Sequence, residues 1–289
     1  MISELARKFA RYAFSTRYSR GAIPGLFPKY KEDPRALATD RRFKKWARVA
    51  GVLGARLEVL AALCGTDKFG PHQYTPVYEA LMGPMRRQPV TLLELGVGGF
   101  GHSLGGESLL MWAAYFRRGR IYGVDIEDKT RLSKGRIIVL QCSQADQDRL
   151  AALGDEIGPF DFVIDDGSHV NAHQIASFQT LWPHVKHGGA YVVEDVQTSY
   201  WPAFGGGALG SPGYERSAMA YFRALADSVN APEFLEPPKA RIDPRIGSIA
   251  FHHNLIVITK DLRVRLSNLA LEADAVRATL LTPGNGASG

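Results

Sequence analysis

The hydrophobic positions of this chain alternate between short apolar runs and amphipathic stretches. Seven runs of strand length are rich in β-branched and aromatic residues. Helical periodicity lies between the first and second runs, the third and fourth, and the fourth and fifth. Such an alternation predicts a parallel sheet with helices on both faces. The last two runs follow each other closely, as the arms of a hairpin do. We therefore predict an α/β fold with a doubly wound, mostly parallel seven-stranded sheet. The runs are residues 91–95, 120–126, 135–142, 160–165, 189–194, 246–251 and 254–259.

Helical patterns also precede the predicted sheet. Apolar residues recur at helical spacing over residues 40–63, and over residues 2–12 with basic residues between them. We expect the large apolar side chains of the longer helix to be its buried face: Phe43, Trp46, Val49, Val52, Leu53, Leu57 and Leu60. The predicted organisation is a basic helical N-terminal extension (residues 1–64), a main domain (65–275) and a disordered tail (276–289).

The positive charge of the chain is concentrated near its N-terminus. Residues 1–56 contain 14 Lys and Arg against 4 Asp and Glu, whereas the whole chain has a formal net charge of +6. No nucleic-acid reader motif accompanies these basic residues, so we expect no nucleic-acid partner. Contact with an anionic membrane surface, an acidic substrate or a partner subunit explains the charge as well. The apolar positions of the first 60 residues favour a homo-oligomer.

The cysteines and the apolar runs bear on the cellular location. Cys64 and Cys142 have neither metal-site nor redox spacing, which is typical of free thiols in a reducing compartment. No run approaches the roughly 20 apolar residues that a transmembrane helix needs, and basic residues interrupt the first apolar positions. We expect a cytoplasmic protein without a transmembrane segment.

Two of the buried runs end in acidic residues. The carboxyl ends of parallel strands meet at one edge of a sheet, where open α/β folds bind ligands. The sequence therefore predicts a metal-assisted active site at this edge. Neighbouring residues of a strand point in opposite directions, so we expect Asp165 to orient the turn or the cofactor and not to bind metal. The residues that end the two runs are Asp165, Asp166, Gly167, Ser168 and His169 in one and Glu194 and Asp195 in the other.

A glycine turn follows the first run of the predicted sheet. Glycines in this position let the backbone approach a ligand at the start of a helix. The second run ends in Asp125, and an acid there typically binds ribose hydroxyls. The turn lacks the full G-x-G-x-x-G spacing and begins with Glu94, which suits S-adenosylmethionine better than NAD. The expected cofactor contacts are Glu94, Gly96, Gly98, Asp125 and Asp165, with Ser143 and Gln144 beside the adenine.

Two further segments contain candidates for substrate binding. The loop at residues 65–74 gathers several reactive groups before another predicted helix, although a polar connector would look the same. The segment at residues 197–213 is rich in aromatic residues and glycines, which is typical of a lid with glycine hinges. His173 lies one helical turn beyond His169 and contacts either substrate or solvent. The candidates are Thr66, His72, Tyr74, His173, Tyr200 and Trp201.

The order of these motifs resembles that of the class I S-adenosylmethionine-dependent methyltransferases. Within that class it is most similar to the magnesium-dependent sugar O-methyltransferases of the macrocin and mycinamicin type. The resemblance covers residues 65–202, about half of the chain, and the D-D-G-S-H and E-D motifs are its most specific part. Its motifs are G-T-D-K at 65–68, H-x-Y at 72–74, E-L-G-V-G-G at 94–99, S-Q-A-D at 143–146, D-D-G-S-H-x-x-x-H at 165–173 and E-D at 194–195.

The resemblance implies a Rossmann-like methyltransferase domain with S-adenosylmethionine and Mg²⁺ as cofactors. It implies that Asp166, Glu194 and Asp195 bind the metal and that His169 is the general base. The implied acceptor is a sugar hydroxyl of a glycosylated natural product or an oligosaccharide. Such a hydroxyl is unactivated, so a metal ion that lowers its pKa and a base that removes its proton both help it to attack the methyl group.

Three alternatives remain open at the level of the sequence. A related metal-dependent O-methyltransferase could act on a non-sugar hydroxyl, as in a catechol-like small molecule. A non-haem iron oxygenase could use Asp166, His169 and His173, but it would leave the glycine turn and Asp125 unexplained. A nucleotide-binding scaffold would have no catalytic use for His169.

Overall fold

The computed structural model describes residues 41–270, except positions 71, 100–103, 237–238, 240–241, 264 and 269. Most of the predicted N-terminal extension and the whole predicted tail therefore lie outside the described residues. Among the described residues, no helix has both the length and the apolar character needed to cross a membrane.

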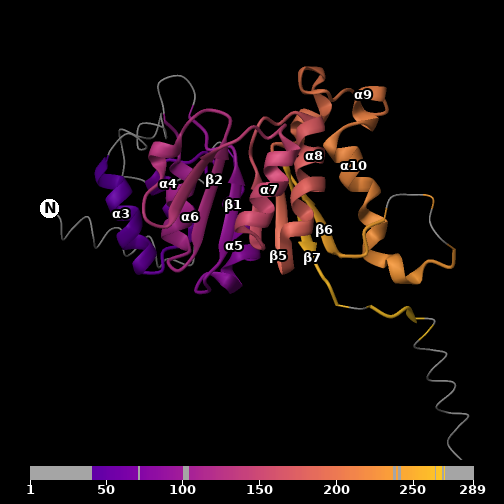
Figure 1. Cartoon of the computed structure of the whole chain (residues 1–289), viewed down its shortest axis with the longest axis horizontal. Helices are drawn as coiled ribbons and strands as arrows, with labels where there is room; N and C mark the ends of the chain where they lie inside the picture. The colour runs from indigo at the N-terminus through magenta and orange to yellow at the C-terminus, as the bar shows by residue number, and fades with distance from the viewer. Residues whose placement is uncertain are drawn as a thin grey trace, which may run out of the picture.

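A seven-stranded sheet forms the centre of the molecule (Figure 1). Its strand order is β3-β2-β1-β4-β5-β7-β6, with β1 to β5 parallel and β7 antiparallel to both of its neighbours. The predicted fold and the predicted hairpin are confirmed. The strands are β1 Thr91–Leu95, β2 Arg120–Asp125, β3 Ile137–Gln141, β4 Phe160–Asp165, β5 Val185–Glu194, β6 Ile246–His252 and β7 Leu255–Lys260.

Helices cover both faces of this sheet, and alternate strand residues pack against different helices. One apolar core joins the sheet to α3–α6 and the other joins it to α7, α8 and α10. Figure 1 shows α3, α4 and α6 at the left of the sheet and α9 and α10 at its right. The helices are α3 Arg41–Val52, α4 Leu57–Cys64, α5 Thr75–Met82, α6 Glu107–Tyr115, α7 Gln147–Ile157, α8 Asn171–Leu181, α9 Pro212–Glu215 and α10 Ala218–Ala224.

The central strands are apolar because helices cover them on both sides. All six residues of β4 are buried between β1 and β5, so the acid at its end stands at the edge of a dry core. The last pair of the β1–β4 ladder is Leu95 and Asp165, and the backbone N–H of Asp166 continues the ladder to the carbonyl of Leu95 at 2.9 Å. β1 and β4 therefore deliver their following turns to the same place.

The prediction of one helix over residues 40–63 is wrong in two respects. The helix is interrupted between α3 and α4, where Gly54 has a positive φ of 79° and Arg56 is extended. The predicted apolar face is also only partly right, because Leu57 and Leu60 are buried whereas Val49, Val52 and Leu53 are exposed. The buried side of α3 contains small residues, Ala47, Ala50 and Gly51, and a Cβ on Gly51 would lie 2.2 Å from the carbonyl oxygen of Ala114 in α6. Close helix packing selects the small residues over the large ones.

Candidate active site

The turn after β4 lies directly against the glycine turn after β1. Gly96 has a φ of +84°, and a Cβ there would lie 2.0 Å from the carbonyl oxygen of Asp166. Only glycine permits this approach, because an L side chain would both strain the backbone and collide with the neighbouring turn. The predicted cofactor turn and the predicted metal turn are therefore in contact.

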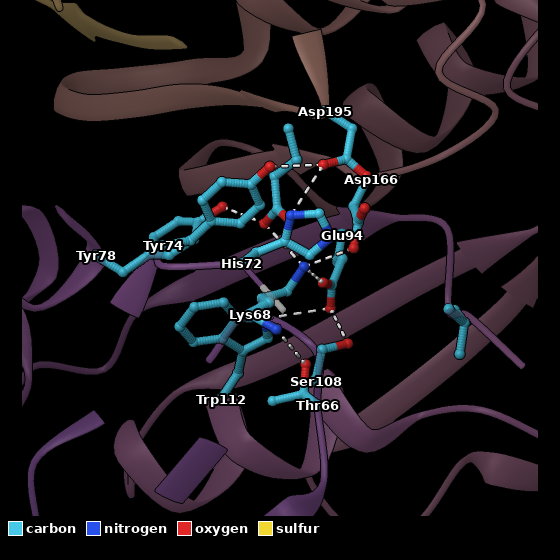
Figure 2. Close-up of polar contacts among 12 residues, drawn as sticks. Thr66, Lys68, His72, Tyr74, Tyr78, Glu94, Ser108, Trp112, Asp166 and Asp195 are labelled. Carbon is cyan, nitrogen blue, oxygen red and sulfur yellow. Dashed lines mark hydrogen bonds and ion pairs between the residues drawn. The ribbon is translucent and has the colours of Figure 1, made fainter. Parts of the chain in front are cut away.

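Lys68 lies at the centre of the acidic residues (Figure 2). Its Nζ is 2.5 Å from Oδ2 of Asp166, 2.8 Å from Oε1 of Glu194 and 3.2 Å from Oε1 of Glu94. The side chain is fully buried. The loop before α5 thus supplies one cation to carboxylates from the ends of β1, β4 and β5.

Burial and mutual repulsion shift the pKa values of this cluster. Burial raises the pKa of Glu94 to about 7, against the opposing charge of Lys68. Burial also raises the pKa of Glu194 well above its usual range, and the charge of Asp166 adds to this effect. For Lys68, burial lowers the pKa, but the surrounding carboxylates outweigh it and the net shift is upward. The cluster therefore has a strong demand for positive charge.

His169 and Asp195 face each other above this cluster. Nε2 of His169 is 3.5 Å from Oδ2 of Asp195, and the two residues have positive φ angles of 56° and 55°. A left-handed backbone is uncommon outside glycine and often marks a functional position. Nδ1 of His169 is buried and has no hydrogen-bond partner among the residues that the structure describes.

Two tyrosines orient the carboxylates: Tyr74 at the end of the loop before α5, and Tyr78 in the first turn of α5. The Tyr74 hydroxyl donates to Oδ1 of Asp195 at 2.5 Å, and the Tyr78 hydroxyl donates to Oε1 of Glu194. His72 stacks on Tyr74, and its Nδ1 lies 3.6 Å from Oδ1 of Asp195. His72 and Tyr74, both predicted as substrate contacts, thus lie at the acidic cluster.

The residues present fit a divalent cation. One ligand atom each from Asp166, His169 and Asp195 can be chosen so that all three lie within 4.8 Å of one another. Four carboxylates meet here against the single ammonium of Lys68, and the carboxylate oxygens are the hard ligands that Mg²⁺ prefers. The predicted metal ligands are Asp166, Glu194 and Asp195, whereas the three residues that come together within 4.8 Å include His169 and not Glu194. Oε1 of Glu194 already accepts hydrogen bonds from Lys68 and Tyr78.

The predicted cofactor acids have partners within the chain. Glu94 accepts through Oε2 from Ser108 and Trp112 of α6. Oδ2 of Asp125 accepts from the backbone of Val97 at 3.0 Å and from Nζ of Lys129 at 3.0 Å.

Lys129 connects the end of β2 to the glycine turn. Its ammonium also donates to the carbonyl of Gly98, a predicted cofactor residue with a φ of +66°. The D-x-x-x-K spacing from Asp125 is the only sequence signal that could have indicated this residue.

At the end of β3, Gln144 connects to the turn after β4. Its Nε2 donates to Oδ1 of Asp165 at 2.7 Å, and its Oε1 accepts from the backbone of Ser168 at 2.8 Å. Burial raises the pKa of Asp165 to about 6, although hydrogen bonds from Ser177 and Tyr191 oppose this shift. Ser143 uses its hydroxyl to accept from the backbone of Ala145. Asp165 therefore supports the turn, as its direction along the strand predicts.

Thr66 and His173 make local contacts. Thr66 is buried, and its hydroxyl lies 3.5 Å from the backbone nitrogen of Lys68. Nδ1 of His173 is 2.8 Å from the hydroxyl of Ser168. Among the described residues, the group that could hold a metal contains Asp195 and not His173, so the iron triad of the oxygenase hypothesis is not assembled.

The aromatic segment after β5 is anchored to α8. It forms two 3₁₀ turns, Val196–Tyr200 and Pro202–Phe204, and Asn171 of α8 donates to the carbonyls of Thr198 and Phe204. A Cβ on Gly206 would lie 2.3 Å from the carbonyl oxygen of Ser199. Close packing therefore requires a glycine at this position. Tyr200 and Trp201 are 44% and 48% exposed at the surface of the segment.

Sequence reasoning missed three residues that build the site. Lys68 belongs to the G-T-D-K motif but received no role, Tyr78 falls in the helix predicted after the loop at residues 65–74, and Asn171 is an unspecified position of the D-D-G-S-H-x-x-x-H motif. Their partners lie 98, 116 and 27 residues away in the chain, in the cases of Asp166, Glu194 and the Thr198 carbonyl. A pattern of local spacing contains no signal for such pairs.

Comparisons with known proteins agree with this geometry. A family model described as "Methyltransferase domain" matches residues 100–196. The 8-demethyl-8-alpha-L-rhamnosyl tetracenomycin-C 2'-O-methyltransferase of Streptomyces olivaceus is 44% identical over 205 residues, which are 70% of this chain and 53% of the relative. Mycinamicin VI 2''-O-methyltransferase of Micromonospora griseorubida is 41% identical over 248 residues, which are 81% of this chain and 62% of the relative.

Solved structures give the same result. MycE methyltransferase from the mycinamycin pathway, in complex with Mg, SAH and mycinamycin VI, is 34% identical with a TM-score of 0.68. The match covers 93% of this chain and 74% of that chain. A second crystal form with Mg and SAH gives a TM-score of 0.70 at 31% identity, over 96% of this chain and 75% of that chain. By contrast, the chain spans only 53–62% of the length of the two curated relatives described above.

Proposed function

The chain belongs to the family of S-adenosylmethionine-dependent methyltransferases that includes MycE, and from this membership we propose that it methylates a sugar hydroxyl. The methyl donor is S-adenosylmethionine, Mg²⁺ is the metal, and the acceptor is a glycosylated natural product or an oligosaccharide. The observation that supports this proposal most is the convergence of Asp166, His169 and Asp195 at one edge of the sheet.

The carboxylates of Asp166, Glu194 and Asp195 would hold the metal. When bound, Mg²⁺ supplies positive charge that lowers the pKa of a coordinated sugar hydroxyl. Mg²⁺ prefers oxygen ligands, so His169 remains available for the proton. The phenols of Tyr74 and Tyr78 fix Asp195 and Glu194 from behind and limit their rotation.

His169 takes the proton from the acceptor hydroxyl at Nε2. This nitrogen faces the carboxylate of Asp195, whereas Nδ1 is buried. As the proton moves to His169, the hydroxyl oxygen forms a bond to the methyl carbon and the carbon–sulfur bond of the sulfonium breaks. The products are the methyl ether and S-adenosylhomocysteine. Fixing the two reactants in line supplies roughly 7 kcal/mol or more in favourable cases.

The methyl donor binds along the glycine turn after β1. Gly96 and Gly98 let the backbone approach it, and Asp125 at the end of β2 binds the ribose hydroxyls. Asp165, Ser143 and Gln144 complete this side by supporting the turn after β4 and the adenine pocket. Because this turn contacts the turn of Asp166, the donor methyl group and the activated hydroxyl are brought together.

The acceptor binds near the loop before α5 and the aromatic segment after β5. Thr66, His72, Tyr74 and His173 surround the acidic cluster or its turn, and Tyr200 and Trp201 offer exposed rings for stacking on a sugar face. A homo-oligomer that uses the exposed apolar residues of α3 is also part of this proposal. Light scattering of the full chain and of a variant with Val49, Val52 and Leu53 replaced by Ser tests that part.

The acceptor class is tested by a panel assay with S-adenosylmethionine and mass spectrometry of the products. The panel contains a rhamnosyl tetracenomycin, mycinamicin VI, free oligosaccharides and a catechol. Methylation of one or more glycosides, with the catechol unchanged, is the expected result. Methylation of the catechol alone would replace the sugar acceptor with the non-sugar alternative.

A further inference from the structure

Lys68 is a fully buried lysine that the proposed chemistry does not use. Its ammonium contacts Asp166 and Glu194, two of the proposed metal ligands, and Glu94 of the cofactor strand β1. A buried ammonium is costly unless it is paired and hydrogen-bonded, and here three carboxylates supply that pairing. The reverse also holds, because these carboxylates find no other cation this close among the described residues.

The backbone around Lys68 fixes the ammonium in this position. Gly65 ends α4 in a left-handed conformation with a φ of 77°, which turns the chain toward the sheet edge. The carbonyl of Lys68 accepts from the backbone N–H groups of Tyr74 and Thr75 at 3.1 and 3.3 Å, which ties it to the start of α5. The backbone of Lys68 is therefore fixed by the end of α4 before it and by the start of α5 after it, so its ammonium is positioned by the fold.

The charge of Lys68 partly offsets the negative charge of the carboxylates around it. Glu94, Asp166, Glu194 and Asp195 together can place up to four negative charges within a few ångströms, and like charges in a poorly solvated site repel strongly. A site that relied on the metal alone for neutralisation would be strained whenever the metal was absent. Lys68 supplies one permanent positive charge and leaves an excess of negative charge for a divalent ion.

We propose that Lys68 is the resident counter-ion of the metal site, which positions Asp166 and Glu194 and keeps the site folded before the metal binds. This inference rests on the metal clause of the proposed function. In this role Lys68 is a positioning residue that touches neither substrate nor cofactor. Metal binding then completes a partly neutralised site and is not required for folding.

The test compares thermal unfolding of the full chain in EDTA and in saturating Mg²⁺ for the wild type and for Lys68→Met. Removing the ammonium leaves buried carboxylates that a bound metal or an added proton must neutralise. The variant should therefore lose more stability in EDTA than in Mg²⁺, and its metal-induced rise in Tm should exceed that of the wild type by roughly 5–10 °C. Lys68→Arg keeps the charge and should behave like the wild type.

Lys186→Met is the matched control, because Lys186 also pairs with a buried acid. Its Nζ lies 2.7 Å from Oδ2 of Asp161, at the end of the sheet away from the site. This variant should lose the same stability with and without Mg²⁺, as expected of a purely structural lysine. If Lys68→Met does not fold, the double variant Lys68→Met/Glu94→Gln takes its place, because it removes one cation together with one anion. Its metal-induced rise in Tm is then compared with that of the wild type.

The outcomes separate this inference from the proposed function. Mn²⁺ binding measured by electron paramagnetic resonance shows whether the wild type holds a metal at all. Absence of bound Mn²⁺ would overturn both the metal clause and the role of Lys68. Bound Mn²⁺ together with an equal metal-induced rise in Tm for the wild type and the Lys68 variant would overturn the role of Lys68 alone.

Discussion

Nε2 of His169 lies 3.5 Å from Oδ2 of Asp195, although the two residues follow different strands of the sheet. Both have a left-handed backbone, a conformation that costs roughly 1–3 kcal/mol for a residue other than glycine. Asn254 of the β6–β7 hairpin is the third such residue in the described part of the chain, and its carbonyl accepts from the backbone of Val196 at 3.3 Å. The strain is therefore concentrated where the acid and the base meet.

Replacing His169 with Asn should abolish turnover and leave cofactor binding intact. Asn tolerates the left-handed backbone but cannot accept the proton, so kcat should fall by about 100- to 10,000-fold. Calorimetry should give an unchanged dissociation constant for S-adenosylhomocysteine. His187→Gln at the other end of the sheet is the control and should keep full activity. Unimpaired turnover of the His169 variant would show that His169 is not the general base.

Replacing Gly96 with Ala should destabilise the contact between the two turns. The new Cβ would lie 2.0 Å from the carbonyl oxygen of Asp166, at a φ of +84°. Urea unfolding should show a loss of roughly 3 kcal/mol or more, together with weakened cofactor binding. Gly188 also has a positive φ but no atom within 4 Å of its missing Cβ, so Gly188→Ala should cost only roughly 1–2 kcal/mol. Equal losses would show that the two turns can move apart.

Replacing Asn171 with Ala should release the aromatic segment after β5. Asn171 donates to two carbonyls of the segment and accepts from Ser199 and Ala218, so its loss leaves buried polar groups unpaired. We expect a cost of about 2–4 kcal/mol and faster hydrogen exchange over residues 196–207. Gln179→Ala on the same helix removes an exposed bond to Tyr221 and should change neither. Slow exchange in the Asn171 variant would mean that other contacts hold the segment.

The unfolding free energy should depend on pH through Glu94. Burial raises the pKa of Glu94 to about 7 in the folded protein, above its usual value of 4.5. Between these values the folded state retains a proton that the unfolded state releases. The stabilisation is therefore fully present below about pH 4.5 and is lost as the pH rises to about 7.

Urea unfolding from pH 5 to 8 in EDTA checks this dependence against Glu94→Gln. The wild type should lose about 3 kcal/mol relative to the variant across the range. A difference that stays constant would show that Glu94 is already ionised at pH 5, with Lys68 as its partner.

The fold and half of the site could be predicted because they depend on local pattern. The apolar runs determine the strands, and parallel strands necessarily bring Asp166, Glu194 and Asp195 to one edge. The position of His169 next to Asp166 in the same turn follows in the same way.

The remaining contacts depend on distances between distant parts of the chain. Lys68 approaches Asp166 and Glu194 only because α4 and α5 pack on the sheet, which no local spacing shows. The buried face of α3 was mispredicted for the same reason. Hydrophobicity favours burial of Val49 and Val52, but close packing of α3 on α6 leaves room only for small residues such as Gly51. Tertiary packing, not propensity, decided both.

Metal-dependent methyl transfer is the central claim, and removal of the metal tests it most directly. The full chain is dialysed against EDTA, and methyl transfer from S-adenosylmethionine to an accepted glycoside is measured before and after Mg²⁺ is restored. We predict that activity disappears in EDTA and returns with Mg²⁺, whereas Asp195→Asn, which tolerates the same backbone, does not recover. Methyl transfer that continues unchanged in excess EDTA would contradict the account.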